Sequence, residues 1–436
     1  MQKNVVAILV GLCVFIGGGL FLYGFLDLVV LLGQGIPQDD VASDYVTGVI
    51  WALLLGLSIV IWPISRDRLP LIRCWAAKCL VTLGFMLLYE SHYGLDSYGY
   101  FAAAADPRGL IAPFTFGAGT TNVTWLAWAH TQIFPHSYHM MKVSFSMVGL
   151  LALYTFYRAV VLFLKEERIK ILYVLVLLPS NLFWSSVLGK DPVVLLGIAL
   201  YVYGVVSWRA NYRISNIFIA AIGTLLAMSF RPWLGPILMA PLSVFTLGKM
   251  RGMMTRIMFT AVIAVAFFFA LGRFKTNFNI ETSEDLVKST GAISQSWAIG
   301  GGGQVIEGGL ESTAQIISFM PLGIVTALFR PLPGEILNPF GLLAGFENFC
   351  LLVLLYRCIT RTRLNELSGV PLWGIVLVLL WATVYGFASY QNLGTAVRFR
   401  LQIMPTMLCL LIYFSRKRGL LPASSALALK PAMQSP

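Results

Sequence analysis

The chain has 436 residues, of which 58% are hydrophobic and only 11% are charged, whereas ordinary soluble domains carry roughly 25% charged residues. A water-soluble globule of this composition would expose large apolar areas, and an intrinsically disordered chain would need far more charge. The composition therefore predicts an integral membrane protein. The formal net charge is +12, but no Lys/Arg-rich tract suited to duplex DNA is present, so we expect no nucleic-acid partner.

Apolar stretches of about 20 residues, the length that spans a bilayer as a helix, divide the chain into twelve predicted spans. These spans lie near residues 5–32, 46–64, 72–90, 142–164, 171–188, 192–208, 216–231, 235–248, 257–272, 338–358, 371–390 and 399–415. A thirteenth apolar stretch, residues 314–329, is short and contains Pro321, so we expect it to be re-entrant or interfacial. The sequence thus predicts an all-α polytopic membrane protein that forms a single domain, residues 1–436.

The distribution of Lys and Arg predicts the orientation of the chain. With the N-terminus in the cytoplasm, about two thirds of the 31 basic residues fall on the inner side, as the positive-inside rule requires. The first inner group contains Arg66, Arg68, Arg73 and Lys78. Few acidic residues fall on that side: Asp67, Glu166, Glu167 and Glu366. We therefore predict that both termini, including the tail 419–436, are cytoplasmic.

Two predicted outer segments are long enough to carry a function. The first, residues 90–141, is rich in aromatic side chains and is expected to form amphipathic helices on the outer leaflet. The aromatic residues are Trp125, Trp128, Phe134 and Tyr138. The second, residues 273–339, contains glycine clusters at 300–303 and 308–309, which suggest a mobile flap around the short apolar stretch.

Five basic residues lie at the outer ends of predicted spans: Lys190, Arg231, Arg330, Arg398 and Arg400. Two of them occur in a repeated string, F-R-P-x-x-G-x-I-L, which begins at Phe230 and again at Phe329. Proline ends the helix that carries the arginine and favours the first turn of the next, so guanidinium and helix N-terminus can point to one place. Such a cluster predicts a site for a lipid-linked phosphate or pyrophosphate. Alternatively, each side chain simply snorkels to lipid headgroups.

Two carboxylates near the start of the first outer segment are candidate general bases for a sugar hydroxyl. Asp96 is the first choice and Glu90, at the end of the third predicted span, is the second. Either side chain could instead cap the helix expected to follow it.

Three further carboxylates have predicted roles in orienting or pairing. Asp191 follows Lys190 and precedes a proline, which favours helix capping with a local ion pair. Glu335 is placed to orient Arg330. Glu347 lies well inside a predicted span and is expected to face the protein interior with a basic partner.

All four histidines lie in the first outer segment: His92, His130, His136 and His139. No neighbouring carboxylate pattern completes a zinc or manganese site, so we expect no metal and no other cofactor. Aromatic neighbours favour interfacial or acceptor-binding roles instead, and we include His92 and Tyr100 among the candidate substrate-binding residues.

Several short strings resemble segments of known membrane enzymes. Gly94-x-Asp96-x-x-x-Tyr100 after a span resembles the G-x-D-x-x-x-Y signature of bacterial exopolysaccharide and O-antigen polymerases of the Wzy type. It also looks like the acidic first outer loop of type C (GT-C) glycosyltransferases. Residues 188–191 and 397–405 are similar to segments of the same polytopic enzymes. The first outer segment has no D-x-D pair, however, which departs from a metal-dependent type C mechanism.

The resemblance implies transfer of glycosyl units from a polyprenyl-pyrophosphate carrier to an acceptor glycan at the outer face of the cytoplasmic membrane. In that mechanism the five basic side chains would bind the pyrophosphate and stabilise the charge that develops as it leaves. Asp96 or Glu90 would take the proton from the acceptor hydroxyl. The aromatic residues of the first outer segment would stack on sugar rings, and the glycine-rich flap would admit and release chains.

Other functions fit the same sequence. A single-sugar type C transferase that uses a polyprenyl-monophosphate donor would need fewer cations, and an O-antigen ligase would use the same donor as a polymerase. A lipid or polysaccharide transporter is a different class, but few ionisable residues lie near the middle of the predicted spans. A non-catalytic scaffold of a polysaccharide export machinery is a further alternative, and that machinery is also a candidate partner of an enzyme.

Overall fold

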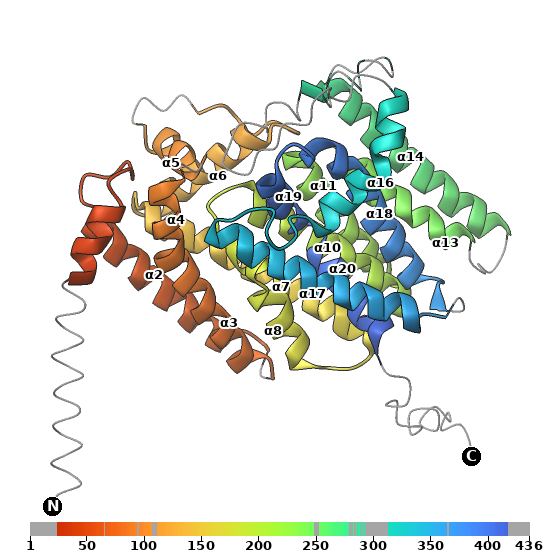
Figure 1. Cartoon of the computed structure of the whole chain (residues 1–436), viewed down its shortest axis with the longest axis horizontal. Coiled ribbons are helices and arrows are strands. Elements are labelled where there is room, and N and C mark those ends of the chain that lie inside the picture. The colour runs from red at the N-terminus through yellow and green to blue at the C-terminus, as the bar shows by residue number, and fades with distance from the viewer. Residues whose placement is uncertain are drawn as a thin grey trace, which may run out of the picture.

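The computed structural model describes residues 24–64, 66–93, 96–106, 111–247, 253–278, 313–363 and 366–416, with isolated positions between 282 and 292. Over these residues the chain is all-α, with no β-strand (Figure 1). Most of the first predicted span, the glycine clusters at 300–303 and 308–309, and the tail 419–436 lie outside the described residues.

Within the described residues, six helices are long and apolar enough to cross a membrane, which supports a multi-pass membrane protein. They are α2 (Val41–Ile61), the continuous helix Arg68–His92, α7 (Tyr138–Leu164), α10 (Lys190–Asn211), α17 (Pro339–Arg361) and α18 (Val370–Ser389). The helix Arg68–His92 consists of α3 (Arg68–Leu80), a π-helical turn η1 (Val81–Phe85) and α4 (Met86–His92). A seventh candidate is the pair α19 (Leu393–Arg400) and α20 (Met404–Ser415), which is bent by 71°.

Prolines interrupt two of the twelve predicted spans, 171–188 and 235–248, and residues 5–23 of the first predicted span lie outside the described residues. The stretch 171–188 breaks at Pro179 into α8 (Ile169–Leu177) and α9 (Pro179–Trp184), since proline restricts the preceding residue to an extended conformation. The stretch 235–248 likewise forms three short pieces. The remaining helices are α11 (Ile214–Phe230), α12 (Leu234–Met239), η2 (Ala240–Ser243), α13 (Val244–Leu247), α14 (Met253–Phe278) and α16 (Thr313–Phe329).

The segment 90–141 contains two helices, α5 (Asp96–Ala105) and α6 (Gly119–Ile133). Both lie toward the top of Figure 1, near α19. At the opposite end, the connection between α2 and α3 contacts both α7 and the connection that follows it, through ion pairs of Asp67 with Arg158 and of Arg66 with Glu167. The described residues of the predicted first inner group therefore gather at this end, with one correction. Lys78 lies in the middle of the helix Arg68–His92 and is fully buried.

Helix α10 runs through the centre of the structure, packed between α7 and α11. Its contact with α11 depends on small residues. A Cβ added at Gly223 would lie 2.4 Å from the backbone nitrogen of Tyr201, and one at Gly204 would lie 2.5 Å from that of Ala220. Small residues at such positions let helix backbones approach closely in a membrane, where dispersion contacts rather than water exclusion hold helices together. This close contact fixes the ends of α10 and α11 relative to each other.

We predict that Gly223→Ala destabilises the protein by about 1–3 kcal/mol, because the added methyl forces the two helices apart. The matched control is Gly272→Ala in α14, where nothing lies within 4 Å of the new Cβ. That variant is expected to be neutral or stabilising by up to about 1 kcal/mol through helix propensity. Thermal unfolding of the purified protein in detergent measures both effects, and equal midpoints for the two variants would contradict the packing described here.

Candidate functional site

A buried carboxylate at the start of α10 joins two arginines that are far apart in the sequence. Asp191 is 1% exposed. Its Oδ1 accepts a hydrogen bond of 2.9 Å from Nη2 of Arg231, and its Oδ2 accepts one of 2.7 Å from Nε of Arg398. Arg231 follows α11 and Arg398 lies on α19, so this single carboxylate ties three helices together. The predicted local ion pair with Lys190 does not form, since Asp191 binds Arg231 and Arg398 instead.

The first copy of the F-R-P string has the predicted local structure, in which Arg231 lies between the end of one helix and the start of the next. Helix α11 ends at Phe230, Arg231 is extended, and two turn hydrogen bonds lead directly into α12. The guanidinium carbon of Arg231 lies 4.1 Å from the centre of the Phe399 ring, and its Nη1 is 3.4 Å from the hydroxyl of Tyr385. Arg231 is 4% exposed. Arg231 is therefore enclosed by its neighbours, and its role in the site is to hold Asp191 in place.

Lys190 lies beside this pair and is held by a residue of the segment 90–141. Its Nζ donates a 2.7 Å hydrogen bond to the hydroxyl of Thr120, at the start of α6. The same end of α6 is fixed to α11, because the side chain of Asn122 donates to the Ser229 carbonyl at 2.7 Å. Three predicted cations, Lys190, Arg231 and Arg398, thus gather at one end of the structure.

Asp96 is the exposed carboxylate of the site. It lies in the first turn of α5, its side chain is 64% exposed, and its Oδ2 is 4.0 Å from Nη1 of Arg398. Tyr100 lies one turn later and is buried. Burial, together with the nearby carboxylate of Asp96, raises the pKa of the Tyr100 hydroxyl to about 12. Tyr100 therefore stays protonated, while Asp96 is accessible to a molecule bound beside Arg398.

Arg398 also lines a cavity of about 520 Å³ between the helix Arg68–His92, α9, α17, α19 and the chain that precedes α17. Aromatic rings form much of its wall: Tyr89, Tyr93, Phe183, Trp184 and Phe340. The guanidinium carbon of Arg398 is 5.4 Å from the centre of the Trp184 ring. Leu80, Phe85 and Leu343 also line the cavity and are exposed, so it opens on the apolar surface of the helices.

The cavity contains one buried carboxylate, Glu347 of α17. Its Oε2 accepts the backbone N–H of Ser180 at 2.9 Å, and its Oε1 accepts the hydroxyl of the same residue at 2.5 Å. Glu347 faces the interior as predicted, and Arg400 is the basic residue whose charge acts on it, although the two form no ion pair. Among the described residues no Lys, Arg or His nitrogen lies within 4 Å of this carboxylate.

Glu90, the second candidate base, belongs to a separate buried network. Its Oε2 lies 2.7 Å from Nζ of Lys142, and its Oε1 accepts a 3.0 Å hydrogen bond from the hydroxyl of Tyr138. Tyr138 is also 2.9 Å from the hydroxyl of Ser97, the residue after Asp96. Both oxygens of Glu90 therefore have buried partners. The side chain positions the start of α5, and we do not assign it the role of base.

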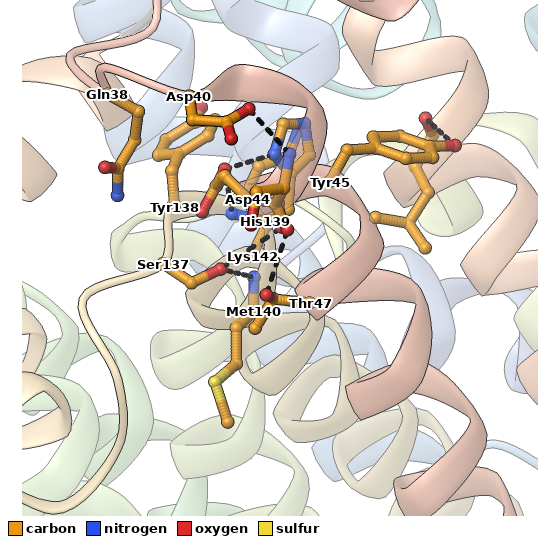
Figure 2. Close-up of polar contacts among 12 residues, drawn as sticks. Gln38, Asp40, Asp44, Tyr45, Thr47, Ser137, Tyr138, His139, Met140 and Lys142 are labelled. Carbon is orange, nitrogen blue, oxygen red and sulfur yellow. Dashed lines mark hydrogen bonds and ion pairs between the residues drawn. The ribbon is translucent and has the colours of Figure 1, made fainter. Parts of the chain in front are cut away.

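Figure 2 shows the neighbouring part of this network along the start of α7. His139 and Lys142 lie next to Tyr138, and Nδ1 of His139 is 2.5 Å from Oδ2 of Asp44 on α2. Both side chains of this second pair are buried. The two pairs connect α2, α4 and α7 below α5, and so give the exposed Asp96 a rigid support.

Two of the five predicted cations lie outside the cluster. Arg330 donates from Nε to both oxygens of Glu335, at 2.9 and 3.1 Å, so Glu335 orients Arg330 as predicted. Arg400 is buried and donates to the carbonyl of Ala327 at 2.8 Å, to the Asn348 side chain and to the Arg330 carbonyl. Arg400 thus anchors the end of α16. The second copy of the F-R-P string therefore builds a connection between helices rather than the cation cluster.

The remaining candidates make their side-chain contacts elsewhere within the described residues. The Nδ1 atom of His92 lies 3.1 Å from the Leu88 carbonyl of its own helix. Trp125 and Trp128 pack against each other, and Phe134 packs on Trp51, whereas the aromatic wall of the cavity comes from other elements. Over the part of the chain that the structure describes, no three His, Cys, Asp or Glu side chains converge on a metal position.

Comparison with protein-family models, with curated proteins and with solved structures finds no match for this chain. Its function must therefore be argued from the cluster around Asp191 and the cavity beside it.

We predict that Asp191→Asn destabilises the protein by about 3–5 kcal/mol, because it leaves two guanidiniums without their shared buried carboxylate. Asp96→Asn changes an exposed carboxylate of the same cluster, and it is expected to alter stability by no more than about 0.5 kcal/mol. Denaturant unfolding in mixed micelles measures the difference. If both substitutions shifted the midpoint equally, Asp191 would not be the centre of the cluster.

Proposed function

We propose that the protein is a membrane glycosyltransferase that moves glycosyl units from a polyprenyl-pyrophosphate carrier to an acceptor glycan at the outer face of a bacterial cytoplasmic membrane. In this proposal the product is a polymer of the transferred units. The polyprenyl chain lies in the apolar part of the cavity, and the pyrophosphate lies against Arg398.

The observation that carries this proposal is the position of Arg398 between a buried carboxylate and an aromatic cavity. The Nε atom of Arg398 donates to Asp191, while the side chain of Arg398 is still 23% exposed and lines the cavity. A fixed guanidinium at the end of an apolar cavity suits an amphiphile with an anionic head, because the head is bound by charge-assisted hydrogen bonds and the chain by apolar contact. A polyprenyl pyrophosphate has this form.

The proposed chemistry uses the charges of the cluster in two ways. The acceptor hydroxyl attacks the anomeric carbon of the donor sugar while the bond from that carbon to the pyrophosphate oxygen breaks. The leaving pyrophosphate keeps the electron pair, and Arg398, with Lys190 beside it, stabilises the negative charge that develops. Asp96, 4.0 Å from Arg398, accepts the proton of the attacking hydroxyl.

A transporter of lipid-linked saccharides is a second candidate, because two ionisable side chains are buried within spans. Lys78 and Glu347 lie inside the helix Arg68–His92 and α17, respectively, and buried charges at such depth often mark a transport path. The products separate the two functions. A transferase lengthens a saccharide in detergent solution, whereas a transporter acts only across a sealed bilayer.

We predict that Arg398→Ala abolishes formation of longer saccharides, since the leaving pyrophosphate loses its principal cation. A loss of about 100-fold or more is expected for a group that stabilises charge only in the transition state. The assay incubates purified protein with a polyprenyl-pyrophosphate oligosaccharide and resolves the products on a gel.

The matched control is Arg213→Ala, which removes an exposed arginine at the opposite end of α11 from Arg231. Normal product length and rate in the control, together with loss in Arg398→Ala, support the proposal. Wild-type product formation by Arg398→Ala would refute it.

We also predict that Asp96→Asn removes turnover and leaves carrier binding intact, because the amide cannot accept the proton but does not disturb Arg398. Binding of the carrier and formation of product are measured on the same preparation. Retention of at least half of the wild-type rate would show that Asp96 is not the base.

A further inference from the structure

The short helix α9 forms one wall of the cavity and carries two of its aromatic rings. Leu182, Phe183 and Trp184 all line the cavity, and the Trp184 ring faces the guanidinium of Arg398. With six residues, α9 is too short to be stable by itself, so tertiary contacts must fix its position.

At its N-terminal end α9 is held by Glu347. The carboxylate accepts the backbone N–H and the hydroxyl of Ser180, the second residue of the helix, at 2.9 and 2.5 Å. Glu347 lies on α17, across the cavity from the helix Arg68–His92. This contact therefore links α9 to one side of the cavity.

At its C-terminal end α9 is held by Lys78. Its Nζ donates to the Ser185 carbonyl at 3.0 Å, to the Ser185 hydroxyl at 2.7 Å and to the Ser186 hydroxyl at 2.9 Å. The Ser186 hydroxyl donates in turn to the Leu182 carbonyl, so its lone pairs face the ammonium. Three donors meet three acceptors, and no described carboxylate lies within 4 Å of this ammonium.

The signs of the two charges match the ends that they contact. A carboxylate meets backbone N–H at the start of α9 and an ammonium meets backbone carbonyl at its end, as the dipole of the peptide groups favours. Helix α7 packs closely against the C-terminal end of α9, since a Cβ added at Gly149 would lie 2.0 Å from the Ser185 carbonyl oxygen. Burying two charges that do not pair with each other is costly in a membrane, which requires a role for both.

We infer that Lys78 and Glu347 are positioning residues for the carrier site, holding α9 so that Phe183 and Trp184 form the cavity wall and Trp184 stays against Arg398. This inference rests on the proposed function, because it identifies the cavity as the place where the carrier binds. It assigns no contact between either charged group and the carrier's phosphates. Their effect on binding passes through α9.

The test measures binding of geranylgeranyl pyrophosphate to the purified full-length protein in detergent, well below the unfolding temperature of each variant. Lys78→Met is expected to weaken binding roughly 3- to 30-fold, the range typical of a residue that acts through a packed element. The matched control is Arg158→Met, which removes the cation of the Asp67 pair at the opposite end of the structure and does not line the cavity. It is expected to lower the unfolding temperature and to leave the affinity unchanged.

A double-mutant cycle separates positioning from general destabilisation. If Lys78 acts through Trp184, then Lys78→Met combined with Trp184→Ala binds the probe no more weakly than Trp184→Ala alone. The variant Ser185→Ala with Ser186→Ala removes two of the three acceptors and is expected to show the same dependence, even if Lys78→Met does not fold. Glu347→Gln tests the other end in the same cycle.

The outcomes distinguish this inference from the proposed function. Wild-type affinity in Lys78→Met or in the double serine variant, with loss of affinity in Arg398→Ala, overturns the inference alone. Losses that add fully in the cycle also overturn it. No binding by the wild-type protein, or undiminished binding by Arg398→Ala, overturns the proposed function and the inference with it.

Discussion

The site depends on one buried carboxylate that holds two guanidiniums. Asp191 fixes Arg231 and Arg398 at the ends of α11 and α19, while its own helix, α10, is packed through glycines against α11. In a low-dielectric environment neither arginine can be left without a counter-charge, and Asp191 cannot be left without theirs. Arg231 is enclosed by Asp191, Phe399 and Tyr385, whereas Arg398 keeps one side toward the cavity. Because of this asymmetry, Arg398 and not Arg231 is the guanidinium to which we assign the anion in the proposed function.

Other buried charges organise the surroundings of this site in the same manner. The Glu90–Lys142 pair, with Tyr138, supports the start of α5 and hence Asp96. Arg400 fixes the end of α16 by donating to carbonyl oxygens. Each of these groups connects helices that hydrophobic contact alone would hold with little preference for one arrangement, because lipid tails compete equally well for apolar surface. Directional polar contacts thus decide how the helices are placed around the cavity.

The sequence predicted the fold class and part of the site, and particular residues explain the limits. Composition and apolar stretches were enough to predict an all-α membrane protein. The stretch 171–188, however, is apolar throughout and predicts one span, whereas Pro179 divides it into two helices. The F-R-P string correctly predicted that a helix ends just before Arg231, because the effect of proline on a helix end is local. The same string at Arg330 serves a different purpose, since its neighbours Glu335 and Arg400 are set by tertiary packing. Asp191 was assigned to Lys190 by adjacency, and no local pattern points to Arg398, 207 residues away.

The most direct measurement of the central claim is an electron cryomicroscopy structure of the protein in lipid nanodiscs with a non-hydrolysable polyprenyl-pyrophosphate analogue. The account predicts density for the two phosphates within hydrogen-bond distance of Arg398, with Arg398 still bound to Asp191 and the isoprenoid chain between the aromatic rings of the cavity. A structure in which the analogue lies elsewhere, or in which Arg398 has left Asp191 and points to lipid, would contradict it.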